Sequence, residues 1–258
     1  MDDNRRMAVL PPLALVYHGV ARVPMRDDPH GLFTSPDLLR RHIDRLRRWG
    51  YDLVTFGELA ERAASGRAGG AAALTFDDGF ADNLHELVPV LDQHDVPATV
   101  FVVAGRLGEA HPDHRGARFL DADELRTLSG RVEIGSHGAT HVDLTALAPD
   151  ALEEELVASR RALEGIVEQA VDLLAYPFGR VDARVAAAAR EAGYRAAGGT
   201  SGRGSWEDPM QLPRQDMTNG NTQFTLRLKR SNRYEPLMRF RVVRAARRAR
   251  RRVAAALS

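Results

Sequence analysis

The sequence predicts an α/β fold, specifically a distorted or incomplete (β/α) barrel of about seven parallel strands. Three observations support this prediction. Short apolar runs alternate with longer amphipathic segments along the chain, as in a parallel sheet wound by right-handed crossovers. The 258 residues can form one large domain. Six or so strand–helix units suit an incomplete barrel better than two packed domains, and an open doubly wound sheet is the alternative.

The first half of the predicted barrel begins with a strand at Leu13–Tyr17. A helix follows from Ser35-Pro36-Asp37, because Ser is a good N-cap, Pro fits the first helical position and an acid suits the first turn. Gly50 ends this helix. The next expected elements are the strand Tyr51–Val54, a helix opened by a capping box of Thr55 and Glu58, the strand Ala71–Phe76, the helix Leu84–Leu91 and the strand Ala98–Val103.

The second half continues the same alternation. The expected elements are the helix Asp121–Leu128, the strand Arg131–Ile134, a loop or short turn at Gly135–His141, the amphipathic helix Pro149–Val167, the strand Leu173–Ala175, the helix Val181–Ala192 and the strand Tyr194–Ala197. We expect residues 1–226 to form the barrel domain and residues 227–258 to form a basic, helical C-terminal tail.

The tail differs sharply in charge from the rest of the chain. Residues 227–252 contain 12 Arg and Lys and one acid, Glu235, whereas the whole chain has a net charge of +1. From Met238 onward the apolar residues have helical spacing, so the tail is expected to associate weakly with an anionic membrane surface. A solvated or disordered tail is the alternative. Nucleic-acid binding is not expected, because the acidic body would oppose it.

Composition limits the chemistry and the compartment. The chain has no Cys, so any metal must be held by His, Asp or Glu. The apolar run near the N-terminus is short, is broken by Pro11 and Pro12, and lacks a small-residue cleavage site. No run approaches the roughly 18 apolar residues of a membrane-spanning helix. We therefore expect no signal peptide and a cytoplasmic location.

Polar residues that could carry chemistry follow three predicted strands. Asp77 and Asp78 come directly after one strand, His137 and His141 shortly after another, and Tyr176-Pro177-Phe178-Gly179 after a third. The carboxyl ends of parallel barrel strands face one side, where active sites lie. The sequence therefore predicts that these groups meet.

The residue types indicate a metal site. His137 and His141 are four apart, so a helical turn would direct both imidazoles the same way. With one carboxylate they would form a two-His, one-carboxylate face that leaves positions open for water and substrate. The second carboxylate would then serve as a base. Zinc is the first choice of metal, and Co, Ni or Fe suit the same ligands.

Each of these signals also has an ordinary structural interpretation. An isolated Asp-Asp pair is usually a solvated turn, and an isolated His-x-x-x-His is usually a helix surface. Their combination at strand ends favours the functional interpretation. Six other histidines are assigned to loops or the surface: His30, His42, His85, His94, His111 and His114.

Two motifs in this order resemble a known family. The segments Leu74–Gly79 (LTFDDG) and Gly135–His141 (GSHGATH) are similar to those of the polysaccharide deacetylase family with the NodB-homology domain, a carbohydrate esterase family 4-like group. The resemblance runs from roughly Leu13 to Arg214. It implies a distorted α/β barrel that hydrolyses N- or O-acetyl groups on glycans with a divalent metal. It also implies that Asp77 is the base and that Asp78, His137 and His141 are the metal ligands.

The chain departs from the family pattern at the third motif. Ala175 stands where the family often has an Arg that steadies the base, and Arg214 or Arg180 is expected to replace it. Phe178 fits the aromatic position whose backbone N–H helps to stabilise the oxyanion. We assign Tyr176, Pro177, Arg180 and Arg214 to substrate binding.

The general acid also differs from the usual pattern. The family's late Leu-x-His appears here as Leu212-Pro213-Arg214, and Tyr17-His18-Gly19 occurs early instead. This arrangement resembles the exopolysaccharide (poly-N-acetylglucosamine) deacetylase branch, in which the acid His comes early. The resemblance therefore implies that His18 is the general acid, and a structural His that caps the strand is the alternative.

The expected function is hydrolysis of N-acetyl groups on an N-acetylated sugar or polysaccharide, which releases acetate. One alternative keeps the fold but makes the protein an amidase or O-acetyl esterase that acts on a non-polymeric substrate. Another is a non-catalytic glycan-binding module, which would be expected to have a broken metal site.

Overall fold

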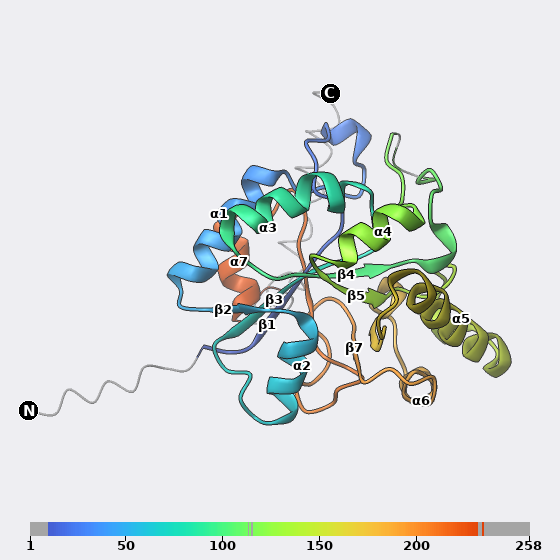
Figure 1. Cartoon of the computed structure of the whole chain (residues 1–258). Helices are drawn as coiled ribbons and strands as arrows, with labels where there is room; N and C mark the ends of the chain where they lie inside the picture. The colour runs from blue at the N-terminus through green and yellow to red at the C-terminus, as the bar shows by residue number, and fades with distance from the viewer. Residues whose placement is uncertain (1–9, 113, 115, 232–233, 235–258) are drawn as a thin grey trace, which may run out of the picture.

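The computed structural model describes residues 10–112, 114, 116–231 and 234. Its centre is one eight-stranded sheet in the order β7-β6-β5-β4-β3-β1-β8, with β2 also paired to β3. Every strand pairing is parallel, and the helices are arranged around the central strands (Figure 1). The predicted incomplete barrel is confirmed. The strands are β1 Leu13–Tyr17, β2 Asp52–Val54, β3 Ala71–Phe76, β4 Thr99–Val102, β5 Glu133–Ser136, β6 Leu173–Ala175, β7 Ala196–Gly198 and β8 Gln215–Asp216.

The middle of the sheet is built on β3, whose six residues are all buried. β1 pairs along one edge of β3, from Leu13 opposite Ala72 to Tyr17 opposite Phe76. β2 pairs with the first half of β3, and β4 pairs with its last two residues. Because the strands are parallel, the residues that follow β1 and β3 emerge together at one end of the sheet.

The helices begin where the sequence places their capping residues. The side chains of Ser35, Thr55 and Asp121 each accept a hydrogen bond from a backbone N–H in the first turn, and Asp121 forms a full capping box with Glu124. These bonds satisfy N–H groups that have no partner within the helix. The helices are α1 Pro36–Arg48, α2 Phe56–Ala64, α3 Val88–His94, α4 Ala122–Ser129, α5 Pro149–Val167, α6 Ala183–Glu191 and α7 Gln223–Arg230.

One predicted helix is divided in the structure. The segment predicted as Leu84–Leu91 consists of a π-helical turn, η2, at Asn83–Leu87, followed by α3. Pro89 lies in the first turn of α3. Proline has no N–H to donate to the preceding turn, so a regular helix cannot continue through it.

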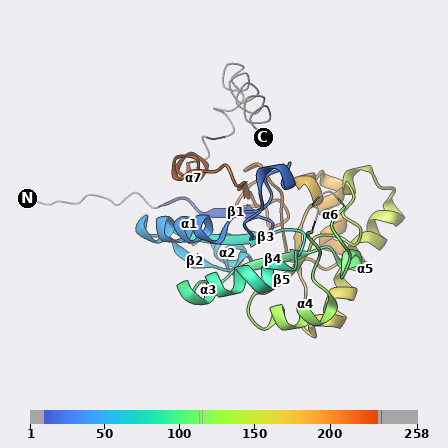
Figure 2. The ribbon, with the colours of Figure 1, turned by 90° about the horizontal axis from the view of Figure 1, so that it is seen from above.

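Two elements near the C-terminus were not predicted. β8 has only two residues, too few for a periodic pattern. α7 runs across the boundary expected between residues 226 and 227, and the Arg230 guanidinium carbon lies 4.6 Å from the centre of the Trp49 ring on the α1 side. Figure 2 shows α7 beside the strands and α1. The folded body therefore extends at least to Arg230.

The predicted amphipathic stretch at Met238–Ser258 lies outside the described residues. Within the part of the chain that the structure describes, no helix has the length and apolar character needed to cross a membrane.

Candidate metal centre and active site

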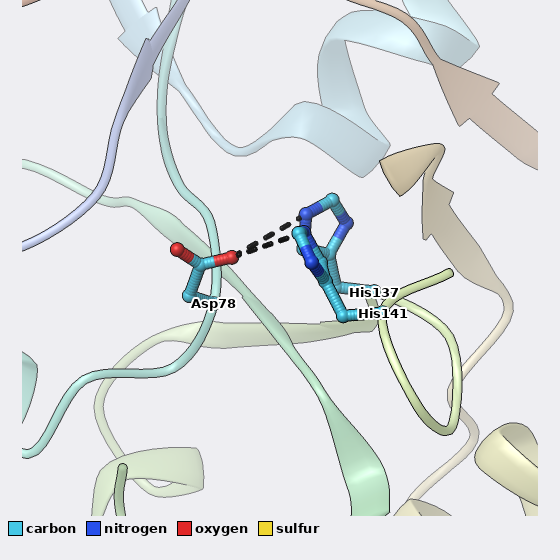
Figure 3. A group of neighbouring side chains, drawn as sticks. All are labelled: Asp78, His137 and His141. Carbon is cyan, nitrogen blue, oxygen red and sulfur yellow. Dashed lines mark ion pairs between the residues drawn. The ribbon is translucent and has the colours of Figure 1, made fainter. Parts of the chain in front are cut away.

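Three potential metal ligands converge at the carboxyl end of the sheet. Nε2 of His137 lies 3.6 Å from Oδ1 of Asp78, and Nε2 of His141 lies 3.5 Å from the same oxygen. The Asp78 carboxylate faces both imidazoles (Figure 3). One ligand atom from each residue falls in a group whose members all lie within 4.8 Å of one another. The predicted meeting of these side chains is therefore present.

The two histidines do not share a helical turn, which corrects the geometric argument drawn from their spacing. His137 directly follows β5, and residues 137–141 form a loop. Gly138 has a φ of +82° and His141 a φ of +60°. These left-handed residues turn the chain back on itself, so that the ring centres lie 4.9 Å apart.

Groups from two other parts of the barrel hold this loop. Glu155 of α5 is buried, and its carboxylate accepts hydrogen bonds from the backbone N–H and the hydroxyl of Thr140. The N–H groups of Ala104 and Gly105 donate to the carbonyl oxygens of Gly138 and Ala139. Glu155 was not predicted from the sequence to support the site, although a charged residue on the apolar side of an amphipathic helix is a recognisable signal.

The surroundings of the two imidazoles fit a metal site. Nδ1 of His137 donates to the carbonyl oxygen of Ala175 at 2.8 Å, which leaves the Nε2 lone pair directed towards Asp78. Burial, and then the charge of His137, lower the pKa of His141 to about 4. Two imidazoles and one carboxylate are a donor set suited to zinc and similar divalent metals, and Asp78, His137 and His141 would hold such an ion.

Asp77 lies beside this group with a different partner. Its carboxylate forms a two-pronged ion pair with Arg214, with N–O distances of 2.7 and 3.0 Å. Burial raises the pKa of Asp77, but the Arg214 guanidinium and His137 lower it by more, to about 2. Asp77 is therefore ionised at neutral pH, as a base must be. Its Oδ2 is 4.0 Å from Nε2 of His137.

Arg214 is itself held in place by buried groups. Its Nε donates to the carbonyl oxygen of Gly199, one NH group donates to the hydroxyl of Thr75, and the guanidinium carbon lies 5.0 Å from the centre of the Phe101 ring. Leu212 forms a parallel bridge with Gly198 of β7, and this contact guides the following residues into the site. Neither Thr75 nor Gly199 was predicted from the sequence to contact the site.

The two arginines considered as partners of Asp77 have different environments. Arg180 is exposed and pairs with Asp143, so Arg214 is the one that contacts Asp77. Arg214 is 0% exposed. A direct substrate contact by the Arg214 side chain is therefore a wrong expectation, because no surface of it is free.

The third motif contributes one exposed side chain. Tyr176 is buried and donates its hydroxyl hydrogen to the carbonyl oxygen of Met210, so its side chain is not free to make the expected substrate contact. Pro177 is also buried. Phe178 has a φ of +58°, is 57% exposed, and its ring centre lies 4.7 Å from that of His141. Of the residues assigned to this motif, Phe178 lies beside His141 of the candidate metal-binding group.

His18 lies at the same end of the barrel. Tyr17, the last residue of β1, pairs with Phe76, which directly precedes Asp77. His18 is half-buried, and its buried Nδ1 has no hydrogen-bond partner within the described part of the chain. Burial raises the pKa of Asp77, and the charges of Arg214 and His137 lower it. The charge of His18 lowers it further, by a smaller amount. This location is the one that a general acid would need.

Two histidines assigned to loops or the surface are buried instead. His42 is 0% exposed and shares a hydrogen bond with the Tyr17 hydroxyl through Nδ1 at 3.1 Å. His114 is 1% exposed and packs against the Phe33 and Phe80 rings. Aromatic packing explains the burial of His114, which the loop-like sequence around it does not indicate.

The comparisons with known proteins agree with this geometry. The family model described as polysaccharide deacetylase matches residues 65–197, which contain Asp77, Asp78, His137 and His141. The chain belongs to the polysaccharide deacetylase family. This assignment confirms the resemblance drawn from the two motifs.

Individual relatives are more distant. The chain is 24% identical to a putative polysaccharide deacetylase, YxkH, of Bacillus subtilis (strain 168), over 70% of this chain and 61% of the relative. It is 34% identical to a chitooligosaccharide deacetylase of Rhizobium leguminosarum bv. trifolii, over 47% of this chain and 53% of the relative. The chain thus spans a little more than half of the length of these relatives. The solved Streptococcus pyogenes deacetylase PplD in complex with acetate has the same fold, with a TM-score of 0.73, 21% identity and coverage of 86% of this chain and 98% of that chain.

Proposed function

We propose that this protein is a metal-dependent hydrolase that removes N-acetyl groups from an N-acetylated sugar or polysaccharide. The observation that carries the proposal is the buried pairing of Asp77 with Arg214 directly beside the Asp78, His137 and His141 group. A carboxylate kept ionised next to a metal-binding set is the arrangement that hydrolysis by an activated water requires. Family membership and the named activity of the Rhizobium relative support an N-acetylglucosamine oligomer as the substrate class.

The chain's own residues divide the chemistry between them. A divalent ion held by Asp78, His137 and His141 would supply Lewis acidity and lower the pKa of water. Asp77 accepts the proton of the attacking water, and Arg214 keeps that carboxylate ionised and oriented. The backbone N–H of Phe178 supports the developing oxyanion. His18 donates a proton to the departing amine, which is a poor leaving group unless it is protonated.

The early position of His18 also supports the exopolysaccharide deacetylase branch within the family. The described residues that follow His141 include no histidine, so a late His cannot serve as the acid there. His18 follows β1 at the end of the sheet that carries Asp77. This position supports the proposal that His18 takes the role of general acid.

An acetate-release screen tests the proposal. The purified protein, stripped of metal and reloaded with Zn, Co, Ni or Fe, is incubated with N-acetylglucosamine oligomers, an O-acetylated glycan and a small cyclic amide. We expect metal-dependent release of acetate and appearance of free amine on the oligomers. Turnover of only the O-acetylated glycan or only the cyclic amide would replace the proposal with the esterase or amidase alternative. The absence of metal-dependent turnover on all three would favour a non-catalytic glycan-binding module.

A further inference from the structure

The segment that carries His18 is attached to the segment that carries Asp77 at three successive points. The Asp77 N–H donates to the carbonyl oxygen of Tyr17 at 2.9 Å. The Asn83 side-chain amide donates to the carbonyl oxygen of His18 at 3.1 Å, and the Val20 N–H donates to Oδ1 of Asp82 at 2.8 Å. The first of these hydrogen bonds continues the pairing of β1 with β3. The other two involve the side chains of Asp82 and Asn83, in the segment that follows Asp77 and Asp78.

The backbone between these points is also confined. A Cβ atom on Gly19 would lie 2.3 Å from the Phe33 ring and 3.0 Å from Oδ2 of Asp82. The Gly19 carbonyl oxygen accepts the Thr34 N–H at 2.9 Å. Only glycine allows the ring and the carboxylate to approach the backbone this closely. Residues 18–20 are therefore fixed on both sides.

Burying the Asp82 carboxylate costs free energy that a purely structural contact would not require. Burial raises its pKa to about 6, and the hydrogen bond from Val20 offsets this only in part. Among the described residues, no Lys or Arg lies within ion-pair distance of it. Asn83 donates to Oδ1 of Asp82 at 3.2 Å and is itself 0% exposed. A neutral side chain could accept the Val20 N–H without the cost of burying a charge. Ionisable groups whose pKa is shifted by burial are concentrated at functional sites.

We infer that Asp82 and Asn83 are positioning residues that fix the backbone of His18 and thereby set the placement of the acid relative to the base, Asp77. This inference rests on the proposed function, because it assigns His18 the role of acid. One continuous segment, residues 77–83, then carries the base and a metal ligand and also holds the acid. His18 has no hydrogen bond to its buried Nδ1 among the described residues, so the backbone contacts are what direct its ring.

The matched variants separate positioning from general stability. Asp82→Ala removes the acceptor for the Val20 N–H, whereas Asp82→Asn keeps an oxygen at Oδ1. Asn83→Ala removes the donor to the His18 carbonyl oxygen and to Oδ1 of Asp82 but leaves Asp82 as the acceptor for the Val20 N–H, and it provides the second test if Asp82→Ala does not fold. Glu86→Ala removes an exposed acid from the same turn and is the control. Unfolding in urea and metal content are measured for each variant.

Two substrates then test how the variants act. An N-acetylglucosamine oligomer has an amine leaving group that needs a proton, whereas 4-nitrophenyl acetate releases 4-nitrophenolate, which leaves without one. We expect Asp82→Ala to lower kcat on the oligomer about 10²-fold, the effect of a misplacement of about 1 Å, with turnover of the aryl ester changed much less. Asp82→Asn should recover most of the loss. In a His18→Ala background, Asp82→Ala should cause no further loss, because its effect passes through His18.

Three results would overturn the inference: equal losses on both substrates, additive losses in the His18→Ala background, or no loss for both Asp82→Ala and Asn83→Ala. A wild-type protein that releases acetate from no N-acetylated glycan would instead refute the proposed function. In that case the positioning is read from the His18 imidazole resonances of ¹⁵N-histidine-labelled protein. Asp82→Ala should shift them and Asp82→Asn should not, and unchanged resonances in Asp82→Ala would overturn the inference independently of activity.

Discussion

Replacing Arg214 with Met would leave the Asp77 carboxylate buried without its partner. The two side chains are 0% and 2% exposed and form two N–O contacts at 2.7 and 3.0 Å. Removing one member of a buried ion pair typically costs about 3–5 kcal/mol, because the other charge remains away from water. We expect Arg214→Met to lose about this much free energy of unfolding, measured by urea denaturation at neutral pH with the metal content held constant.

Two further variants make this prediction decisive. Arg180→Met removes an ion pair with Asp143 in which the arginine side chain is 64% exposed, and such pairs contribute about 0–1 kcal/mol. The double variant Asp77→Asn with Arg214→Met removes both charges, so its loss should be clearly smaller than the sum of the two single losses. A loss for Arg214→Met as small as that for Arg180→Met, or additive losses in the cycle, would refute the reasoning.

Three other predictions concern the metal, the buried histidine and the tail. Elemental analysis of a His137→Ala, His141→Ala double variant should show loss of the bound metal, while His85→Ala, which changes an exposed side chain, should retain it. Burial lowers the pKa of His42 from 6.5 to about 4, so the unfolded state binds more protons between these values and stability falls as the pH drops. Between about pH 7.5 and pH 5 the free energy of unfolding should therefore fall by about 2 kcal/mol because of His42. His42→Gln should abolish this fall in urea titrations. A fall of the same size in the variant would contradict the assignment. Deletion of Met238–Ser258 should leave turnover on a soluble substrate intact and weaken binding to anionic vesicles at low salt, and equal binding by both forms would count against a role for the tail.

Much of the barrel could be predicted because its signals are local. The caps at Ser35, Thr55 and Asp121 are set by residues within one turn, and Ala71–Phe76 has the apolar run of a strand that is covered on both faces. The π-helical turn at Asn83–Leu87 could not be predicted from an apolar period alone. β8 depends on pairing with β1, which is almost 200 residues away in the sequence, and no local pattern records such a contact.

The site was predictable in its metal-binding group and less so in its supporting contacts. Asp78, His137 and His141 could be grouped because they follow parallel strands, although the turn that joins the two histidines is a left-handed loop and not a helix. The choice of Arg214 over Arg180 depends on where the segment after β7 returns to the sheet. The path of this segment depends on the tertiary structure, so both arginines were equally plausible partners of Asp77 from the sequence.

The central claim is that Asp77 removes a proton from water beside a bound metal. The most direct measurement compares acetate release from an N-acetylglucosamine oligomer by the wild type and by Asp77→Asn, each loaded with one metal ion as verified by elemental analysis. Asn has almost the same volume as Asp but is not a base, so we predict that the variant retains its metal and loses about 10²–10⁴-fold in kcat. Near-normal acetate release by fully loaded Asp77→Asn would contradict the account.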